Sequence, residues 1–305
     1  MGARERSSGF RAAYPSLISG LNLDAINWTV FAILFFIAVP FGFYLIQLLI
    51  LTQAIPPSAA ISYFVLTFRA PNFASMFLSN YIHSVSDSTH IYQNTLSSLL
   101  LFLMIYIFYV IVLPYVRFRI PEFRYRFNPR AFVLTLIVIF FLVPFSISGI
   151  SIYFGRILGK TAAWGYSGLL YAFLGFFFYS IVQLLVNLIM QRASGTIPPH
   201  TTSGTRSSHP GAGQEVHEGD HALLSAFVVF ACAFIPFLTI AIILSDMIQP
   251  GTGVFAHLGG FMLGFIIGPI IEMITLSPKM KQKIAFGLFL TLVVVVPATF
   301  WMAVV

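Results

Sequence analysis

The sequence Trp164–Gly175, WGYSGLLYAFLG, decides how the rest of the chain is interpreted. It opens a long apolar segment and places Ser167 between two glycines, Gly165 and Gly168, where a membrane helix is expected to begin. Ninety residues later, His257 opens another apolar segment in the sequence GVFAHLGGFMLG. We expect Ser167 and His257 to meet as a nucleophile and its base.

The composition indicates a membrane protein. Of the 305 residues, 58% are hydrophobic and 8% are charged, whereas soluble domains carry about 25% charged residues. So few charges cannot cover a globular surface, and most of the surface is expected to face lipid. The net charge of +7 does not indicate a nucleic-acid partner, because Lys and Arg lie in short loops beside apolar segments, as topology signals do. Cys232 is the only cysteine, which excludes an intrachain disulfide and a thiolate metal cage.

Seven apolar segments are long enough for a membrane helix of about 20 residues, so the sequence predicts an all-α membrane protein, a polytopic helical bundle. They are residues 28–52, 89–113, 131–152, 164–190, 222–244, 253–275 and 284–305. The first is longer than a signal-peptide core and is interpreted as a retained anchor. Thirteen Lys and Arg residues lie on the side of the N-terminus and three on the other. The N-terminus is therefore expected in the cytoplasm and the C-terminus outside, in a multi-pass protein of the plasma membrane.

Three connections have distinct compositions. Residues 53–88 form a long, half-apolar outer loop that is expected to lie partly in the membrane interface. Residues 191–221 are rich in Gly, Ser, Thr and Pro and are typical of a flexible linker. Four histidines lie in this linker: His200, His209, His217 and His221. Two of them have the i, i+4 spacing of a possible metal pair, but no metal site is expected. The basic run 117–130 orients the chain, with anionic lipid binding as the alternative.

Polar side chains inside a membrane are costly and are candidate functional residues. Four of them lie near the outer ends of the second, fourth and sixth segments: His90, Asn94, Ser167 and His257. These segments run in the same direction, so the four side chains are expected at one depth. Taken singly, each has a structural explanation, since serine often bonds its own helix backbone and asparagine or histidine bonds a neighbouring helix. Their common depth favours a shared site.

Small residues line one face of the fourth and sixth segments: Gly168, Ala172, Gly175, Gly260, Gly264 and Gly268. Such faces let helices approach closely, and a serine hydroxyl must come within about 3 Å of an imidazole nitrogen to pass its proton. Plain helix packing explains the glycines but not why Ser167 and His257 head the two faces. Tyr171, one turn beyond Ser167, is expected to pack flat against the imidazole; a core aromatic is the alternative.

The predicted site is a dyad without an acidic third member. Glu272 lies fifteen residues beyond His257, about 22 Å along a helix. His90 and Asn94 share one helix face at i, i+4 spacing. With the backbone N–H of Ser167, they are candidate donors to an oxyanion. No metal and no other cofactor is expected.

Three motifs together resemble the rhomboid family of intramembrane serine proteases: GYSG at 165–168 with Tyr171, HIYQN at 90–94 and AHLGGFMLG at 256–264. The resemblance covers residues 80–275. It implies membrane-anchored protein substrates, cleaved within or near the outer part of their transmembrane segment through an acyl-enzyme. It also implies a water-filled cavity open to the outside.

The resemblance assigns residues and domains. It implies a Ser167–His257 dyad, oxyanion donors at His90 and Asn94, and supporting roles for a further group: Tyr171, Gly165, Gly168, Gly260 and Gly264. The chain divides into a cytoplasmic tail (1–27), a six-span catalytic domain (28–275) that includes the loop 191–221, and a basic linker with a seventh helix (276–305). Val85 stands where the family often has a histidine, and Phe68-Arg69 is a loose analogue of a loop tryptophan–arginine pair.

Other functions have weaker support. Residues 155–161, GRILGKT, are one residue short of a phosphate-binding loop, and Leu169 breaks the G-x-S-x-G pattern of soluble hydrolases. A catalytically silent rhomboid-like protein that binds transmembrane segments is the main alternative, although it should lack the serine or the histidine. A seven-span receptor or transporter is a third, but the sequence has no repeat with matching broken helices.

Overall fold

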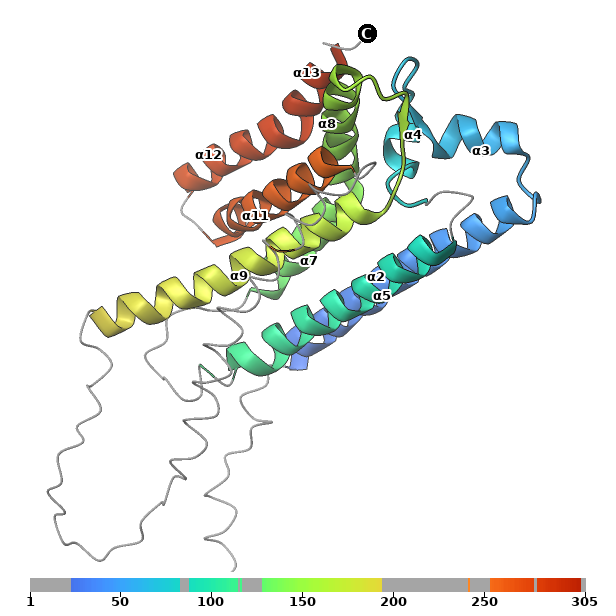
Figure 1. Cartoon of the computed structure of the whole chain (residues 1–305). Helices are drawn as coiled ribbons and strands as arrows, with labels where there is room; N and C mark the ends of the chain where they lie inside the picture. The colour runs from blue at the N-terminus through green and yellow to red at the C-terminus, as the bar shows by residue number, and fades with distance from the viewer. Residues whose placement is uncertain are drawn as a thin grey trace, which may run out of the picture.

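The computed structural model describes residues 23–82, 88–114, 116, 128–193, 241, 253–276 and 279–302. These residues are mostly helical (Figure 1). The longer helices are α2 (Leu23–Leu51), α5 (Ser88–Tyr106), α7 (Pro129–Phe141), α8 (Val143–Ile157), α9 (Ser167–Ala193), α11 (Val254–Leu276) and α12 (Lys279–Leu290). The shorter elements are α3 (Pro57–Phe64), α4 (Phe73–Leu78), α13 (Val296–Met302), the strands β1 (Leu66–Thr67) and β2 (Ala162–Ala163), and two π-helical segments, η1 (Ile107–Val112) and η2 (Thr291–Val295).

Five helices in the described part of the chain are long and apolar enough to cross a membrane. They are Asn94–Val112, Pro129–Ile157, Ser167–Met190, Val254–Thr275 and Lys279–Thr299, and α2 contains a shorter apolar stretch, Ile37–Leu51. The expectation of an all-α membrane protein is confirmed at this level. The predicted segment 222–244, except residue 241, lies outside the described residues, as do the first 22 residues and most of the predicted linker 191–221.

Two helices begin at residues other than the predicted ones, because the predicted starts rest only on where the apolar run begins. The last membrane helix begins at Lys279 rather than at 284, because lysine and glutamine are good helix formers despite their polarity. Helix α9 begins at Ser167 rather than at 164. The predicted nucleophile is therefore the first residue of its helix.

The predicted third segment is one span with a break at Leu142, between α7 and α8. The break follows from Pro144, which has no N–H to donate to the carbonyl of Phe140 four residues earlier. The Tyr81 hydroxyl donates to that carbonyl instead, and the Asn80 amide donates to the Pro144 carbonyl at 3.2 Å. The residues before α5 therefore satisfy the Phe140 carbonyl that the proline leaves open and also bond the Pro144 carbonyl.

The described residues between α2 and α5, 52–82, contain more secondary structure than their loop-like composition suggests. They contain α3, β1 and α4, and β1 pairs antiparallel with β2, Leu66 opposite Ala163. The Arg156 guanidinium of α8 donates through Nε to the Phe68 carbonyl at 2.8 Å. This loop is thus fastened to α8 and to the segment that leads into α9; its placement in a membrane interface stays a prediction.

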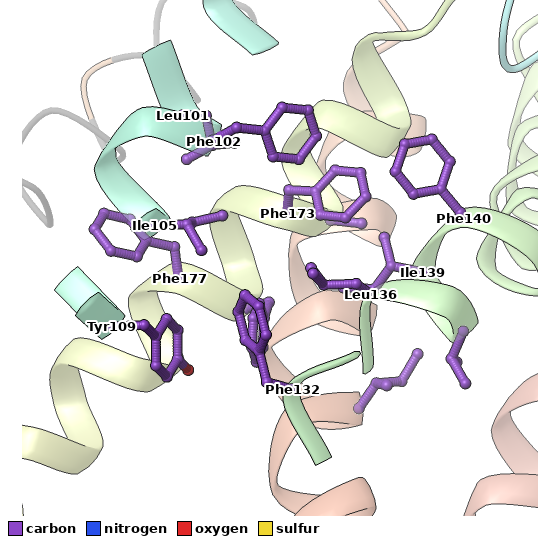
Figure 2. Packing of buried hydrophobic residues seen from close by; sticks show 14 of the residues in the cluster. Leu101, Phe102, Ile105, Tyr109, Phe132, Leu136, Ile139, Phe140, Phe173 and Phe177 are labelled. Atoms are coloured by element: carbon purple, nitrogen blue, oxygen red, sulfur yellow. The ribbon is translucent and has the colours of Figure 1, made fainter. Parts of the chain in front are cut away.

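Aromatic side chains fill the space between α5, α7 and α9 (Figure 2). Phe173 of α9 meets Phe102 of α5 edge to face, with ring centroids 5.3 Å apart, and Phe140 of α7 at 4.9 Å. Phe140 and Phe173 are fully buried. Because lipid tails are as apolar as these rings, the stabilisation comes from close van der Waals packing rather than from removal of water.

Candidate active site

The chain reaches Ser167 through a tightly held approach segment, residues 161–166. The Phe68 N–H donates to the Thr161 carbonyl at 2.9 Å, and the Gly165 N–H donates to the Ser79 carbonyl, also at 2.9 Å. Gly165 has a φ of +136°, which a residue with a side chain rarely adopts. The chain therefore turns sharply at Gly165 and places Ser167 at the start of α9.

Helices α9 and α11 touch through their backbones. A Cβ atom on Gly260 would overlap the Gly168 carbonyl, and one on Gly264 would overlap the Ala172 carbonyl. On α9, a Cβ at Gly175 would overlap the Phe261 carbonyl. The small-residue faces predicted from the sequence do face each other here, and no larger side chain separates the two helices along this contact.

This close crossing brings Ser167 and His257 together. His257 Nε2 and Ser167 Oγ are 2.6 Å apart and hydrogen-bonded. The imidazole is buried, with 8% of its residue surface exposed, whereas Ser167 is partly exposed. With Nε2 unprotonated, the hydroxyl donates and the imidazole accepts, which is the starting arrangement of a nucleophile and its general base.

Tyr171 orients the imidazole by stacking. Its ring lies parallel to that of His257, with an interplanar angle of 8° and a centroid separation of 4.4 Å. Tyr171 is one helical turn beyond Ser167, so a single turn of α9 supplies both the hydroxyl and the flat surface that holds its partner. The expected flat packing of Tyr171 on the imidazole is present in the structure.

The candidate oxyanion donors are placed in part. The first N–H groups of a helix have no intrahelical acceptor, and Ser167 is the first residue of α9. Asn94 lies on α5 and is buried. His90 also lies on α5, but its side chain is outside the described part of the structure.

Ser98 of α5, which the sequence analysis did not single out, lies beside the approach segment. The Ser98 hydroxyl donates to the Asn94 carbonyl at 2.7 Å, and the Ser98 side chain also lies near the Tyr166 hydroxyl. Burial raises the pKa of Tyr166, which keeps this hydroxyl neutral. The spacing His90, Asn94, Ser98 is i, i+4, i+8, a polar stripe that could have identified Ser98.

Glu272 belongs to a different cluster at the far end of α11. It accepts hydrogen bonds from Tyr179 and Gln183 of α9. This carboxylate is therefore committed elsewhere and is not a third member of the Ser167–His257 pair. Among the described residues no group of three His, Cys, Asp or Glu could hold a metal ion; the histidines of the linker 191–221 lie outside them.

The site combines a hydroxyl, an oriented imidazole and a helix N-terminus, which are the groups that acyl transfer requires. All three come from residues whose positions are fixed by backbone contacts between α9 and α11. The chain matches no family model, no curated protein and no solved structure.

Proposed function

We propose that this chain is an intramembrane serine endopeptidase of the rhomboid type. The observation that supports it most is the 2.6 Å hydrogen bond between Ser167 Oγ and His257 Nε2. A buried histidine in a membrane helix needs a partner. Here the partner is a serine at a helix N-terminus, and Tyr171 stacks on the imidazole of the histidine. Structural serines in membrane helices often bond their own helix backbone, as Ser180 bonds the Phe176 carbonyl.

Acylation begins when Ser167 transfers its proton to His257 Nε2 and Oγ attacks the carbonyl carbon of the substrate peptide bond. The negative charge on the tetrahedral intermediate's oxygen is stabilised by the Ser167 N–H, where the helix dipole is favourable, and by Asn94 and His90. The C–N bond then breaks, and the imidazolium returns the proton to the leaving amine.

Deacylation uses the same two residues. A water molecule gives its proton to His257 Nε2 and attacks the ester carbon of the acyl-enzyme. The Ser167–carbon bond breaks, the new carboxyl product leaves, and His257 returns the proton to Ser167 Oγ. Tyr171 keeps the imidazole plane fixed through both half-reactions.

The proposal includes a topology. In this topology the side opposite the start of α9 carries most of the Lys and Arg residues, which supports a position of Ser167 near the outer surface of the plasma membrane. The proposed topology has six core spans and one C-terminal span. Substrates are then membrane-anchored proteins, cut within or near the outer part of a transmembrane segment, where water reaches the partly exposed serine.

The test is cleavage of a panel of single-span proteins by the purified protein in liposomes, with cut sites mapped by mass spectrometry. Ser167→Ala and His257→Ala are each expected to reduce cleavage to background, a loss of about 10⁴-fold or more, while the thermal unfolding curve stays unchanged. Ser180→Ala is the matched control, since Ser180 lies on α9 and bonds Tyr109. Such bonds average about 0.6 kcal/mol in membranes, so its rate should stay within about threefold.

A serine-directed fluorophosphonate gives an independent measurement. It is expected to label wild-type protein and the Ser180→Ala variant but not Ser167→Ala. Undiminished cleavage by either dyad variant would refute the assignment. If wild-type protein neither cleaves any substrate nor reacts with the fluorophosphonate, yet retains single-span proteins, the catalytically silent alternative is correct.

A further inference from the structure

A second polar contact joins α9 to α11 at the end opposite the dyad. Tyr179 donates its hydroxyl to Glu272 Oε2 at 2.9 Å, and the Gln183 amide donates to the same oxygen at 2.7 Å. Glu272 is partly buried in a helix whose other ionisable residue is His257, fifteen positions earlier. A carboxylate there is costly and needs partners, and both of these donors come from α9.

Between the two ends, from Gly168 to Gly175, the backbones of α9 and α11 touch directly. Ring contacts lie beside them: Phe178 packs against Phe261 and Phe265, and Tyr179 meets Phe265 edge to face. The small-residue surface limits how close the helices come but resists sliding less than interdigitating ridges and grooves do, and ring pairs stay favourable over centroid separations of about 4.5–7 Å. Two directional hydrogen bonds onto one oxygen do resist sliding, because a slide lengthens both.

The fold of α11 gives these bonds a particular importance. Pro269 lies inside the helix and removes the hydrogen bond to the carbonyl of Phe265, so the helix bends more easily there. Glu272 lies on the far side of this proline from His257. The ring of Tyr179 covers Gly268, and its hydroxyl extends to Glu272 one turn further on. Tyr179 therefore spans the weak point.

We propose that Glu272 is a positioning residue that fixes the slide and bend of α11 against α9, and so the separation of His257 from Ser167. The inference rests on the proposed protease function. It assigns no proton transfer to Glu272, which lies fifteen residues from the histidine. Its effect is geometric: a displacement of about 1 Å in a catalytic group costs about 10²-fold in rate.

The kinetic test compares Glu272→Leu, which removes the acceptor, with Glu272→Gln, which keeps the size and one acceptor oxygen. Glu272→Leu is expected to lower kcat by about 10- to 100-fold with KM unchanged, at a temperature where the variant is fully folded. Glu272→Gln should restore the rate to within about threefold, since its carbonyl oxygen accepts as the carboxylate does. Met273→Ala, at the exposed neighbouring residue, is the control and should match wild type.

A measurement without proteolysis separates this inference from the proposed function. In a Cys232→Ala background, spin labels at Val186→Cys on α9 and Met262→Cys on α11, both exposed, report the slide of one helix along the other. The distribution of distances between the two labels should be narrow in the labelled protein that keeps Glu272, which is the parent, and in its Glu272→Gln variant. It should be shifted or broadened in the Glu272→Leu variant. If the parent cleaves nothing, the protease proposal fails and these distances alone decide the role of Glu272.

Three results would overturn the inference: an unchanged kcat in Glu272→Leu, a loss that Glu272→Gln does not rescue, or an unchanged distance distribution. If Glu272→Leu does not fold, the double variant Tyr179→Phe, Gln183→Met replaces it. That variant keeps the side-chain volumes and removes only the two donors. It should lower kcat and shift the distances in the same direction.

Discussion

The two ends of the α9–α11 crossing use similar parts in different ways. At the dyad end, Tyr171 of α9 lies flat on His257 of α11, and the imidazole of His257 is hydrogen-bonded to Ser167. At the far end, Tyr179 and Gln183 bond the ionisable group of α11, Glu272. Both ends thus pair a tyrosine of α9 with one titratable side chain of α11.

The difference lies in what the tyrosine contributes. Tyr171 makes its contact with its ring face, which restricts the imidazole to one plane and leaves its Nε2 for Ser167. Tyr179 makes its contact with its hydroxyl, which occupies a carboxylate oxygen. Under the proposed mechanism, His257 must exchange protons and is held through its ring face, whereas Glu272 must stay in place and is held through its polar atoms. The comparison therefore fits a proposal in which one end reacts and the other end holds.

The largest expected effect comes from separating the two helices. Leucine at Gly264 would place its side chain into the Ala172 carbonyl, so Gly264→Leu should destabilise the fold by about 3 kcal/mol and reduce cleavage to background. Gly287→Leu on α12 is the matched control, because a Cβ there meets nothing within 4 Å. Thermal unfolding in detergent and the cleavage rate measure both effects.

If Gly264→Leu kept wild-type stability and activity, the backbone contact would not hold the dyad. The same would follow if Gly287→Leu were equally damaging, since the loss would then reflect the leucine rather than the crossing. Either result would also remove the basis for the proposal that Glu272 fixes the position of α11 along α9.

An intermediate effect is expected at the oxyanion site. Asn94→Ala should lower kcat by about 10²–10³-fold, the cost of one donor in comparable sites, with little change in KM or in stability. Leu96→Ala, at an exposed residue of the same helix, should have no effect. A kcat within about threefold of wild type in Asn94→Ala would exclude Asn94 as an oxyanion donor and leave the dyad untouched.

The helical architecture and the contact between the dyad residues could be predicted from the sequence. Apolar segments of membrane length predict the spans. Ser167 and His257 head two small-residue faces, and in lipid such faces pack together. The catalytic roles of the two residues stay predictions that the dyad variants test.

Other features depend on partners that no local pattern identifies. The break at Leu142 could be suspected from Pro144, but not that Tyr81 would bond the Phe140 carbonyl, since the two residues are 59 positions apart. The bonds from Tyr179 and Gln183 to Glu272 likewise join helices about 90 positions apart. Composition assigned residues 53–88 to a loop, yet the short helices α3 and α4 form there because they pack on the body of the protein.

The smallest effects come from removing one hydroxyl at each end, and they test the comparison most directly. Tyr171→Phe keeps the ring that stacks on His257, so kcat should stay within about threefold, whereas Tyr171→Leu should lower it by about tenfold because the imidazole loses its flat support. Tyr179→Phe keeps the ring over Gly268 but removes a donor to Glu272, and kcat should fall by about three- to tenfold.

Initial rates on one substrate, at a temperature where all variants are folded, measure the three tyrosine variants. Equal losses of kcat in Tyr171→Phe and Tyr179→Phe would mean that both tyrosines act through their hydroxyls, which contradicts the comparison. A loss in Tyr179→Phe alone would show that Tyr171 acts through its ring and Tyr179 through its hydroxyl.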